Sequence, residues 1–253
     1  MLESYAAWFA EYCADGKFYH KIIDNIIQCF VRPGDVAIDC GAHSGRHTFP
    51  LCERVGAAGR VYAIEPIPSL AAQLKEGAPP QLRVIEAAIT DFQGETNFYY
   101  WKDEEALSAL VPYVHPIEAE LEVISVAART LDGIVPEDET VRFLNLDIEG
   151  AEFDALRGAR RILEKDHPLV VFEHGSVESA SRYNYRISEF RDLWDELGYV
   201  VVDLFGRPRQ GMQFEDVSAR YLVAGADEES LELIDNLHIP VILAAQQLTR
   251  SNY

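Results

Sequence analysis

The stretch Val36-Ala37-Ile38-Asp39-Cys40-Gly41-Ala42-His43-Ser44-Gly45-Arg46-His47-Thr48 decides the fold of this chain. A short apolar run ends in Asp39, and two glycines, Gly41 and Gly45, precede a helical pattern that begins at Thr48. This order is typical of a buried strand, a tight turn and the start of a helix. Glycine lets a ligand approach the backbone, and the open N–H groups at a helix start favour an anionic group. The stretch therefore predicts a ligand-binding turn at a strand end.

The spacing of the glycines narrows the kind of ligand. A nicotinamide-binding turn needs Gly-x-Gly-x-x-Gly, whereas here Gly41 and Gly45 are separated by three residues and preceded by Asp39. An acid at the strand end repels a pyrophosphate but can pair with an amino group. A ligand with both an α-amino and a carboxylate group, such as S-adenosylmethionine, fits better than NAD. An ordinary βα turn without a ligand is the alternative interpretation.

A second strand pattern, Arg60-Val61-Tyr62-Ala63-Ile64, also ends in an acid, Glu65. Glu65 lies 20 residues after Gly45, the range in which a carboxylate at the end of the second strand binds ribose hydroxyls. Pro66 ends the strand. A solvated acid at a strand end is the alternative, and the glycine turn before it favours the ligand.

Strand and helix patterns alternate along the chain, which predicts a Rossmann-like α/β fold. We expect a seven-stranded, mostly parallel sheet with helices on both faces and an antiparallel last strand. A third strand is expected over 82–89, and ligands of such sheets bind beyond the carboxyl ends of the strands. Ala88 and Ile89 would then lie against an adenine.

Residues 94–135 break this alternation. The aromatic, strand-like run over 96–101 and a second strand pattern over 123–129 are separated by a polar stretch. This is too long for one crossover, so we expect a hairpin inserted between strands three and four, with a mobile segment over about 102–120. The insertion would lie on the rim of the site and is a candidate for substrate selection.

Acids and a histidine follow the fourth and fifth strand patterns. Asp147 ends the apolar run over 141–146, and Glu173 and His174 end the run over 169–172. An acid and a histidine at adjacent strand ends can deprotonate a hydroxyl. Asp147 and Glu173 could instead hold a divalent cation that lowers the pKa of that hydroxyl. The alternative is a turn in which His174 bonds only to backbone.

Composition excludes several classes of partner. The 253 residues carry a formal net charge of −20, so neither nucleic acid nor an anionic membrane surface is an expected partner. No Cys-x-x-Cys pair and no zinc-like spacing occur among Cys13, Cys29, Cys40 and Cys52. With no signal peptide recognised, a reducing, cytoplasmic compartment is the expectation.

The sequence predicts helical structure over residues 1–30. One apolar stripe contains Tyr5, Trp8 and Tyr12, and another contains Ile22 and Ile26. We interpret 1–30 as a helical cap and 31–253 as the main domain, with the insertion over about 94–135. The stripes cover the sheet or a second subunit, and a homodimer is a hypothesis on this ground. A substrate role for Tyr19 or His20 is a minor alternative.

Several motifs together resemble the FkbM family of class I S-adenosylmethionine-dependent methyltransferases. They are Asp39-x-Gly41-Ala42-x-x-Gly45-x-x-Thr48, Gly59-x-Val61-x-Ala63-x-Glu65-Pro66, Thr130-Leu131-Asp132, Asp147-Ile148-Glu149-Gly150-Ala151-Glu152, Leu156-x-Gly158-Ala159 and Glu173. The resemblance covers about residues 31–175 and says little of the rest. One position departs from it, because the family commonly has asparagine where this chain has His43.

The resemblance implies methyl transfer to oxygen, commonly on a sugar or natural-product hydroxyl. It implies S-adenosylmethionine as cofactor, with magnesium as an optional addition held by Asp147 and Glu173. The catalytic candidates are Asp147, Glu173 and His174. The cofactor-binding candidates are Asp39, Gly41, Ala42, His43, Gly45, Thr48, Glu65, Pro66, Ala88, Ile89 and Asp147. A non-catalytic module that binds S-adenosylmethionine is the rival hypothesis, and a nicotinamide enzyme is a third.

Overall fold

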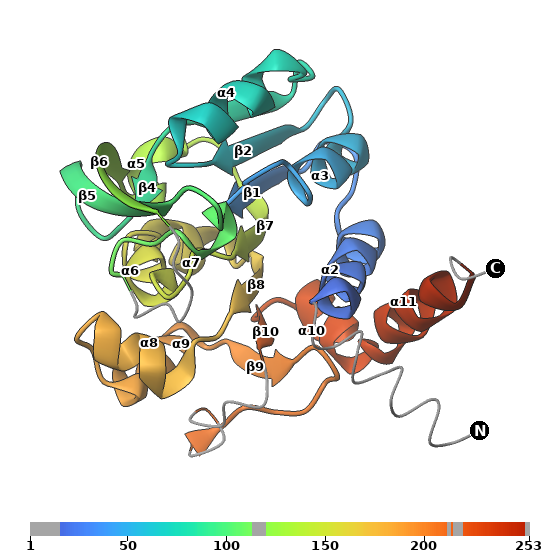
Figure 1. Cartoon of the computed structure of the whole chain (residues 1–253). Coiled ribbons are helices and arrows are strands. Elements are labelled where there is room, and N and C mark those ends of the chain that lie inside the picture. Colours follow the sequence, from blue (N-terminus) through green and yellow to red (C-terminus); the bar gives the residue numbers. More distant parts are fainter. Residues whose placement is uncertain (1–15, 113–119, 212–213, 215–219, 251–253) are drawn as a thin grey trace.

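The computed structural model describes residues 16–112, 120–211, 214 and 220–250 (Figure 1). Its main sheet contains the strands β1 (Val36–Cys40), β2 (Arg60–Ile64), β3 (Leu82–Ile85), β7 (Val141–Leu146), β8 (Leu169–Glu173), β9 (Val200–Asp203) and β10 (Tyr221–Gly225). Their order across the sheet is β3-β2-β1-β7-β8-β10-β9. The prediction of a seven-stranded Rossmann-like sheet is confirmed.

The last strand runs against its neighbours, as the sequence predicts. β10 pairs antiparallel with both β8 and β9, and the other neighbouring strands pair parallel. Tyr221 at the start of β10 lies opposite Glu173 at the end of β8. The first residues of β10 therefore reach the sheet edge at which β1, β2 and β7 end.

Helices cover both faces of this sheet. Side chains alternate along a strand, so Ile38 of β1 packs on one face and Ala37 on the other. The first face is covered by α5 (Leu131–Ile134), α6 (Glu152–Arg157), α7 (Arg160–Asp166) and α9 (Ile187–Leu197). The second face is covered by α2 (Lys17–Phe30), α3 (Thr48–Val55), α4 (Pro68–Glu76), α10 (Glu228–Asp235) and α11 (His238–Arg250). Another helix, α8 (Ser176–Arg182), precedes α9.

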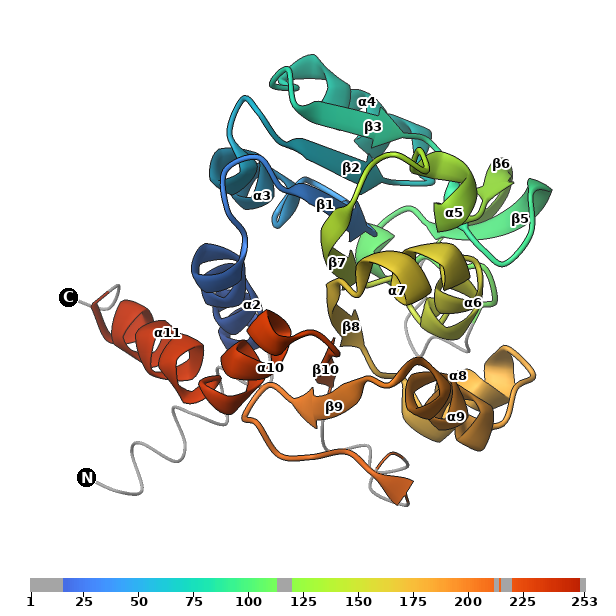
Figure 2. The same ribbon diagram turned by 180° about the vertical axis from the view of Figure 1, so that it is seen from behind.

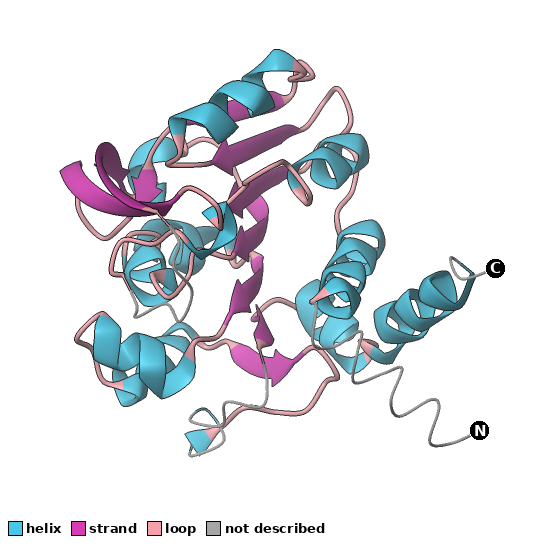
Figure 3. Cartoon of the chain, in the orientation of Figure 1, coloured by secondary structure: helices cyan, strands magenta, loops and turns pink. Residues whose placement is uncertain are grey.

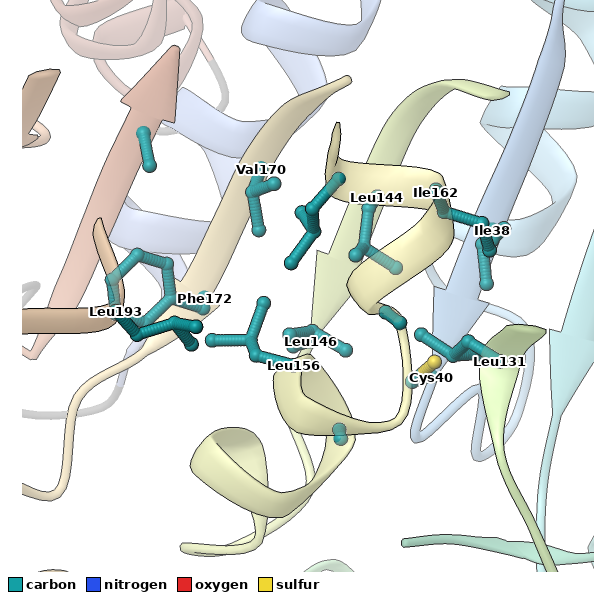
Figure 4. Packing of buried hydrophobic residues seen from close by; sticks show 14 of the residues in the cluster. Ile38, Cys40, Leu131, Leu144, Leu146, Leu156, Ile162, Val170, Phe172 and Leu193 are labelled. Carbon is teal, nitrogen blue, oxygen red and sulfur yellow. The ribbon is translucent and has the colours of Figure 1, made fainter. Parts of the chain in front are cut away.

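The two layers can be followed in the figures. Figure 2 shows α6 and α7 on one side of the sheet and α2 and α3 on the other. Figure 4 shows Ile38, Leu144 and Val170 of three adjacent strands meeting Leu156 and Ile162 of the covering helices. This buried apolar layer holds the strand ends in fixed relative positions.

The third strand is shorter than the sequence predicts. β3 ends at Ile85, which pairs with Ile64 at the end of β2, so the chain beyond Ile85 has no strand to pair with. Ala88 and Ile89 form a separate strand, β4 (Ala88–Ile89), in a second sheet. The expected strand over 82–89 is therefore wrong, because the available partner changes within it.

The insertion is a hairpin, as predicted. β5 (Gly94–Trp101) and β6 (Leu121–Arg129) pair antiparallel, β4 pairs parallel with β6, and a 3-10 turn (Glu105–Leu107) follows β5. Figure 3 shows this second sheet beside the main one. Phe98 and Val126 of the hairpin pack on Ile67 and Ala88, which fixes it beside the end of β2. Part of the expected mobile segment, 113–119, lies outside the described residues.

The first and last described helices, α2 and α11, pack together on one face of the sheet. The stripe of Tyr5, Trp8 and Tyr12 lies outside the described residues. The second stripe is α2, whose Ile22 and Ile26 are buried in the same core as the sheet. The division into 1–30 and 31–253 stays a prediction.

The C-terminal helical region is divided between α10 and α11, and Pro240 lies in the first turn of α11. A proline is tolerated there, because an N–H in the first turn has no helical acceptor. Among the described residues, no helix combines the length and the apolar character needed to cross a membrane.

Candidate active site

A pocket opens at the sheet edge where β1, β2 and β7 end and β10 begins. Nine of the predicted site residues line it: Asp39, Gly41, Ala42, His43, Glu65, Pro66, Ala88, Ile89 and Asp147. The remaining four, Gly45, Thr48, Glu173 and His174, are not among its lining residues. His20, for which a substrate role was only a minor alternative, also lines it, together with side chains that were not predicted for the site, including Arg46, His47, Phe98, Glu105, Glu149, Arg220 and Tyr221.

Two positions of the turn require glycine, because neighbouring atoms lie too close for a Cβ. Gly41 has a φ of 78°, and a Cβ there would collide with the backbone carbonyl oxygen of Asp147. Gly45 has a φ of 86°, and a Cβ there would collide with the Phe49 ring. Gly41 therefore lets the ends of β1 and β7 meet, and Gly45 lets the chain enter α3.

Asp39 is held inside the turn. It is 1% exposed and accepts hydrogen bonds from Thr48 Oγ1 at 2.6 Å and from Asn145 Nδ2 at 2.9 Å. Thr48 begins α3 and Asn145 lies on β7, so this carboxylate ties three elements together. Thr48 acts on the pocket through Asp39. A carboxylate has about four lone-pair positions, so Asp39 can still accept from a ligand.

Glu65 organises the opposite side of the turn. Its Oε2 accepts from the backbone N–H of His43 at 2.8 Å, and its Oε1 accepts from that of Ile67 at 2.9 Å. Burial raises the pKa of Glu65 to about 7, because desolvation outweighs the two N–H donors that favour the charged form. Each oxygen keeps one lone-pair direction for a ligand hydroxyl.

Position 43 needs an unusual backbone more than a particular side chain. His43 has a φ of 46°, in the left-handed region where asparagine and histidine are enriched. Its contribution to Glu65 comes from its backbone N–H, which every residue except proline carries. The histidine therefore preserves the contact that asparagine would make through its backbone.

Three carboxylates converge on the other half of the pocket. One oxygen of each of Asp147, Glu149 and Glu173 lies within 4.8 Å of the others. Arg220 Nε donates to Glu173 Oε1 at 2.9 Å, and the Tyr221 hydroxyl donates to Asp147 Oδ2 at 2.9 Å. Burial, followed by repulsion from Asp147, raises the pKa of Glu149 to about 8 and that of Glu173 well above its usual range. Such a cluster binds protons or a cation.

The turn that aims these acids is strained. Glu149 has a φ of 56° and Gly150 a φ of 104°. The buried Glu152 holds this turn, because its Oε1 accepts from the backbone N–H groups of Ile148 at 3.0 Å and Gly150 at 3.3 Å. Burial raises the pKa of Glu152 to about 8, with the Glu173 charge as the next cause. Strain held in this way is typical of functional turns.

A chain of polar side chains forms the wall contributed by α2. His20 Nδ1 lies 3.2 Å from His47 Nε2, and His47 Nδ1 lies 3.1 Å from Asp24 Oδ1. His20 and His47 both line the pocket. The His20 ring also lies 6.0 Å from the Tyr221 ring, centre to centre. Tyr221 therefore lies between His20 of this wall and Asp147 of the carboxylate cluster.

The family is identified by a match over most of this architecture. A model of the methyltransferase FkbM domain matches residues 39–201, which run from the end of β1 to β9 and make up more than half of the chain. The chain belongs to the FkbM methyltransferase family. The match begins after α2 and ends before Arg220 and Tyr221.

Solved structures are similar to this chain at low identity. A methyltransferase FkbM from Methylobacillus flagellatus KT is 17% identical with a TM-score of 0.46, over 79% of this chain and 50% of that one. This chain thus spans half the length of that protein. A SAM-dependent O-methyltransferase from Thermotoga maritima is 15% identical with a TM-score of 0.43, over 82% and 64% of the two chains. No curated protein matches the sequence.

His174 lies apart from the pocket of this FkbM-family chain. Its Nε2 donates to the carbonyl oxygen of Phe214 at 2.8 Å, and its ring packs edge-on against Phe172 and Phe214. Glu173 is its neighbour on the chain but belongs to the carboxylate cluster, because alternate residues at a strand end point in opposite directions. The geometry gives His174 a packing role and leaves Glu173 beneath Asp147 and Glu149.

The residues that the sequence analysis did not predict, or gave only as a minor alternative, come from segments that are distant along the chain. His20, the minor alternative, lies on α2, and Arg220 and Tyr221, which were not predicted, lie at the start of β10. One signal was available for the second pair: an antiparallel strand begins at the edge where its parallel neighbours end. The expectation of an antiparallel last strand therefore pointed to Arg220 and Tyr221. No comparable signal was available for the contact between His20 and His47.

Proposed function

We propose that this chain is an S-adenosylmethionine-dependent O-methyltransferase that acts on a hydroxyl of a sugar or natural-product-like small molecule. One observation carries the proposal. Two buried carboxylates, Asp39 and Glu65, face one pocket from the ends of adjacent strands, around the glycine turn of an FkbM-family methyltransferase.

The residues on the β2 side of the pocket suit the cofactor. Glu65 can accept from ribose hydroxyls with the lone pairs that its backbone donors leave open. Ala88, Ile89 and Phe98 offer an apolar wall for adenine. Asp39 can accept from the amino group of the methionine moiety, beside the open backbone of Gly41. When bound, S-adenosylmethionine supplies a methyl group on a positively charged sulfur.

The other half of the pocket suits an oxygen acceptor. Oxygen must lose a proton when it is methylated, and Asp147, Glu149 and Glu173 supply acidic and basic groups beside the expected methyl position. Arg220 and Tyr221 hold two of these carboxylates in place. Positioning of the hydroxyl against the methyl group then supplies much of the rate.

Magnesium is a further part of this proposal. Asp147, Glu149 and Glu173 would hold it, since carboxylate oxygens are the ligands that Mg²⁺ prefers. The metal would lower the pKa of a bound hydroxyl. Titration of Mg²⁺ into the protein by calorimetry, with Asp147→Asn alongside, tests this: binding lost in the variant supports it, and absence of Mg²⁺ binding contradicts it.

The cofactor half is tested by calorimetric titration of S-adenosylmethionine and S-adenosylhomocysteine. We expect micromolar binding that Glu65→Gln weakens at least about tenfold, because one backbone N–H then faces an amide NH₂ group. Glu76→Gln, at an exposed position, is the control and should bind as the wild type does. Absence of binding to the wild type would contradict the proposal.

The transfer itself is tested with tritium-labelled S-adenosylmethionine and a panel of sugar glycosides and phenols. Label in an ether product supports an O-methyltransferase. Tight binding of the cofactor without transfer to any member of the panel would favour the rival hypothesis, a non-catalytic module of the same fold.

A further inference from the structure

We propose that His20 is the base that takes the proton of the acceptor hydroxyl, and that His47 and Asp24 position it. This inference rests on the proposed methyl transfer to oxygen. It concerns His20, for which the sequence analysis gave a substrate role only as a minor alternative, and Asp24 and His47, which it did not assign to the reaction.

The three side chains form one continuous chain of contacts. His20 and Asp24 lie four residues apart on α2, so they share one face of that helix. His47, immediately before α3, fits between them: its Nε2 lies 3.2 Å from His20 Nδ1 and its Nδ1 lies 3.1 Å from Asp24 Oδ1. The side chain of His47 is 7% exposed, so its ring is held by its surroundings.

Asp24 sets the direction of these hydrogen bonds. A carboxylate only accepts, so His47 Nδ1 must carry the hydrogen and donate to it. In the neutral form of His47, Nε2 then carries a lone pair and accepts from the Nδ1–H group of His20. The remaining nitrogen, His20 Nε2, therefore carries a lone pair, and among the described residues it has no hydrogen-bond partner. A carboxylate that orients an imidazole in this way is the logic of the catalytic triads.

His20 lies beside the expected reaction centre. Its ring is 6.0 Å from that of Tyr221, whose hydroxyl donates to Asp147. The charged and titratable groups that face it are His47, Arg46, Arg220 and Asp147. Burial, followed by the first two of these groups, lowers the pKa of His20 to about 4, and Asp147 opposes the shift. His20 is therefore neutral, and able to accept a proton, throughout the physiological range.

A weakly basic imidazole is sufficient for this step. The hydroxyl oxygen forms a bond to the methyl carbon as the carbon–sulfur bond breaks, sulfur keeps that electron pair, and the hydroxyl proton passes to His20 Nε2. An alcohol that has begun to receive a methyl group is a far stronger acid than an imidazolium. Asp24 then stabilises the new positive charge through His47.

The other candidate bases are less suited to the step. Glu173 already accepts from Arg220 and does not line the pocket, and burial raises its pKa. His174 does not line the pocket, and its Nε2 donates to the carbonyl oxygen of Phe214. His20 is the histidine of the pocket whose geometry leaves a lone pair directed by a carboxylate.

The test begins with the histidine tautomers. Nitrogen-15 NMR of the full-length protein at pH 7 should show the Nδ1–H tautomer at both His20 and His47, with assignment by His20→Asn and His47→Gln. In Asp24→Asn we expect the Nδ1–H signals of both rings to weaken, because an asparagine amide can present its NH₂ group as well as its oxygen and no longer fixes the direction of the hydrogen bonds. An Nε2–H tautomer at His20 in the wild type would overturn the proposal.

Kinetics then separate a base from a packing residue. Label from S-adenosylmethionine is followed onto methyl α-L-rhamnopyranoside and catechol. We expect His20→Asn to lower kcat by about 100-fold or more, with the affinity for S-adenosylhomocysteine unchanged. Asp24→Asn should lower kcat by about tenfold with KM unchanged, and His238→Gln, at an exposed position, should match the wild type.

Each result is decisive for one of the two proposals. Full turnover in His20→Asn would overturn the role of His20 and leave the methyltransferase intact. Absence of S-adenosylhomocysteine binding in the wild type would instead remove the proposed function, whatever tautomer His20 shows.

Discussion

The two halves of the pocket are built by different means. On the side of β1 and β2, backbone groups define the shape, because Glu65 binds the N–H groups of His43 and Ile67 and Gly41 lies against the carbonyl of Asp147. On the side of α2 and β10, side chains define it, through His20, Arg220 and Tyr221. A change of backbone conformation would therefore disrupt the first half. In the second half, a single substitution can change the chemical groups that face the pocket.

This difference matches the extent of the family. The model of the FkbM domain covers the backbone-defined half from Asp39 onward and the three carboxylates Asp147, Glu149 and Glu173, and it includes neither α2 nor β10. We infer that the first half serves the cofactor, which is common to methyltransferases, and that the second serves an acceptor particular to this chain. The predictions below separate the two halves.

The largest expected effect is that of Gly41→Ala. The added methyl group would meet the Asp147 carbonyl, and φ at this position is 78°. Overpacking and a left-handed alanine together should lower the free energy of unfolding by about 2–5 kcal/mol and abolish cofactor binding. Urea denaturation and calorimetry measure both.

Gly34→Ala is the matched control for this prediction. Gly34 also has a positive φ, 94°, but a Cβ there would have nothing within 4 Å. Gly34→Ala should lower the free energy of unfolding by only about 1–2 kcal/mol, the cost of a left-handed alanine backbone, and leave cofactor binding unchanged. Equal costs at the two positions would contradict the role that we give to the close approach of β1 and β7.

The same two halves differ in how well the sequence predicts their residues. The turn over 39–48, Glu65 and the ends of the other strand patterns carry their information locally, in glycine spacing and strand ends, so nine pocket residues could be named without a structure. The break after Ile85 could not be predicted, because it depends on where β2 ends. The contact between His20 and His47 joins positions 27 residues apart through tertiary packing, which no local pattern encodes.

A second pair of variants compares one buried glutamate from each half. Glu65 uses both of its oxygens for backbone donors, so Glu65→Gln leaves one donor unmatched and should cost about 1–3 kcal/mol of stability. Glu152 accepts both of its loop donors with Oε1, which a glutamine carbonyl can replace. Glu152→Gln should therefore fold at pH 7 without that loss. Equal destabilisation in thermal unfolding would contradict this account of Glu65.

The same Glu152 variant should also change the pH dependence of stability. The folded pKa of Glu152 is raised to about 8 from a usual value near 4.5, so the folded state binds this proton more tightly than the unfolded chain does. That contribution is complete below about pH 4.5 and is lost as the pH rises through 8. Glutamine has no such proton, so Glu152→Gln should gain stability relative to the wild type between pH 5 and 8. Parallel curves of unfolding free energy against pH would contradict it.

The smallest effect on function is expected for His174→Gln. The glutamine amide can still donate to the Phe214 carbonyl, but the ring contacts with Phe172 and Phe214 are lost. We expect a loss of about 1 kcal/mol in the free energy of unfolding and methyl transfer within about twofold of the wild type. A loss of turnover as large as that of His20→Asn would place the base at the end of β8. Retained turnover would instead leave the proton chemistry to the wall that α2 contributes.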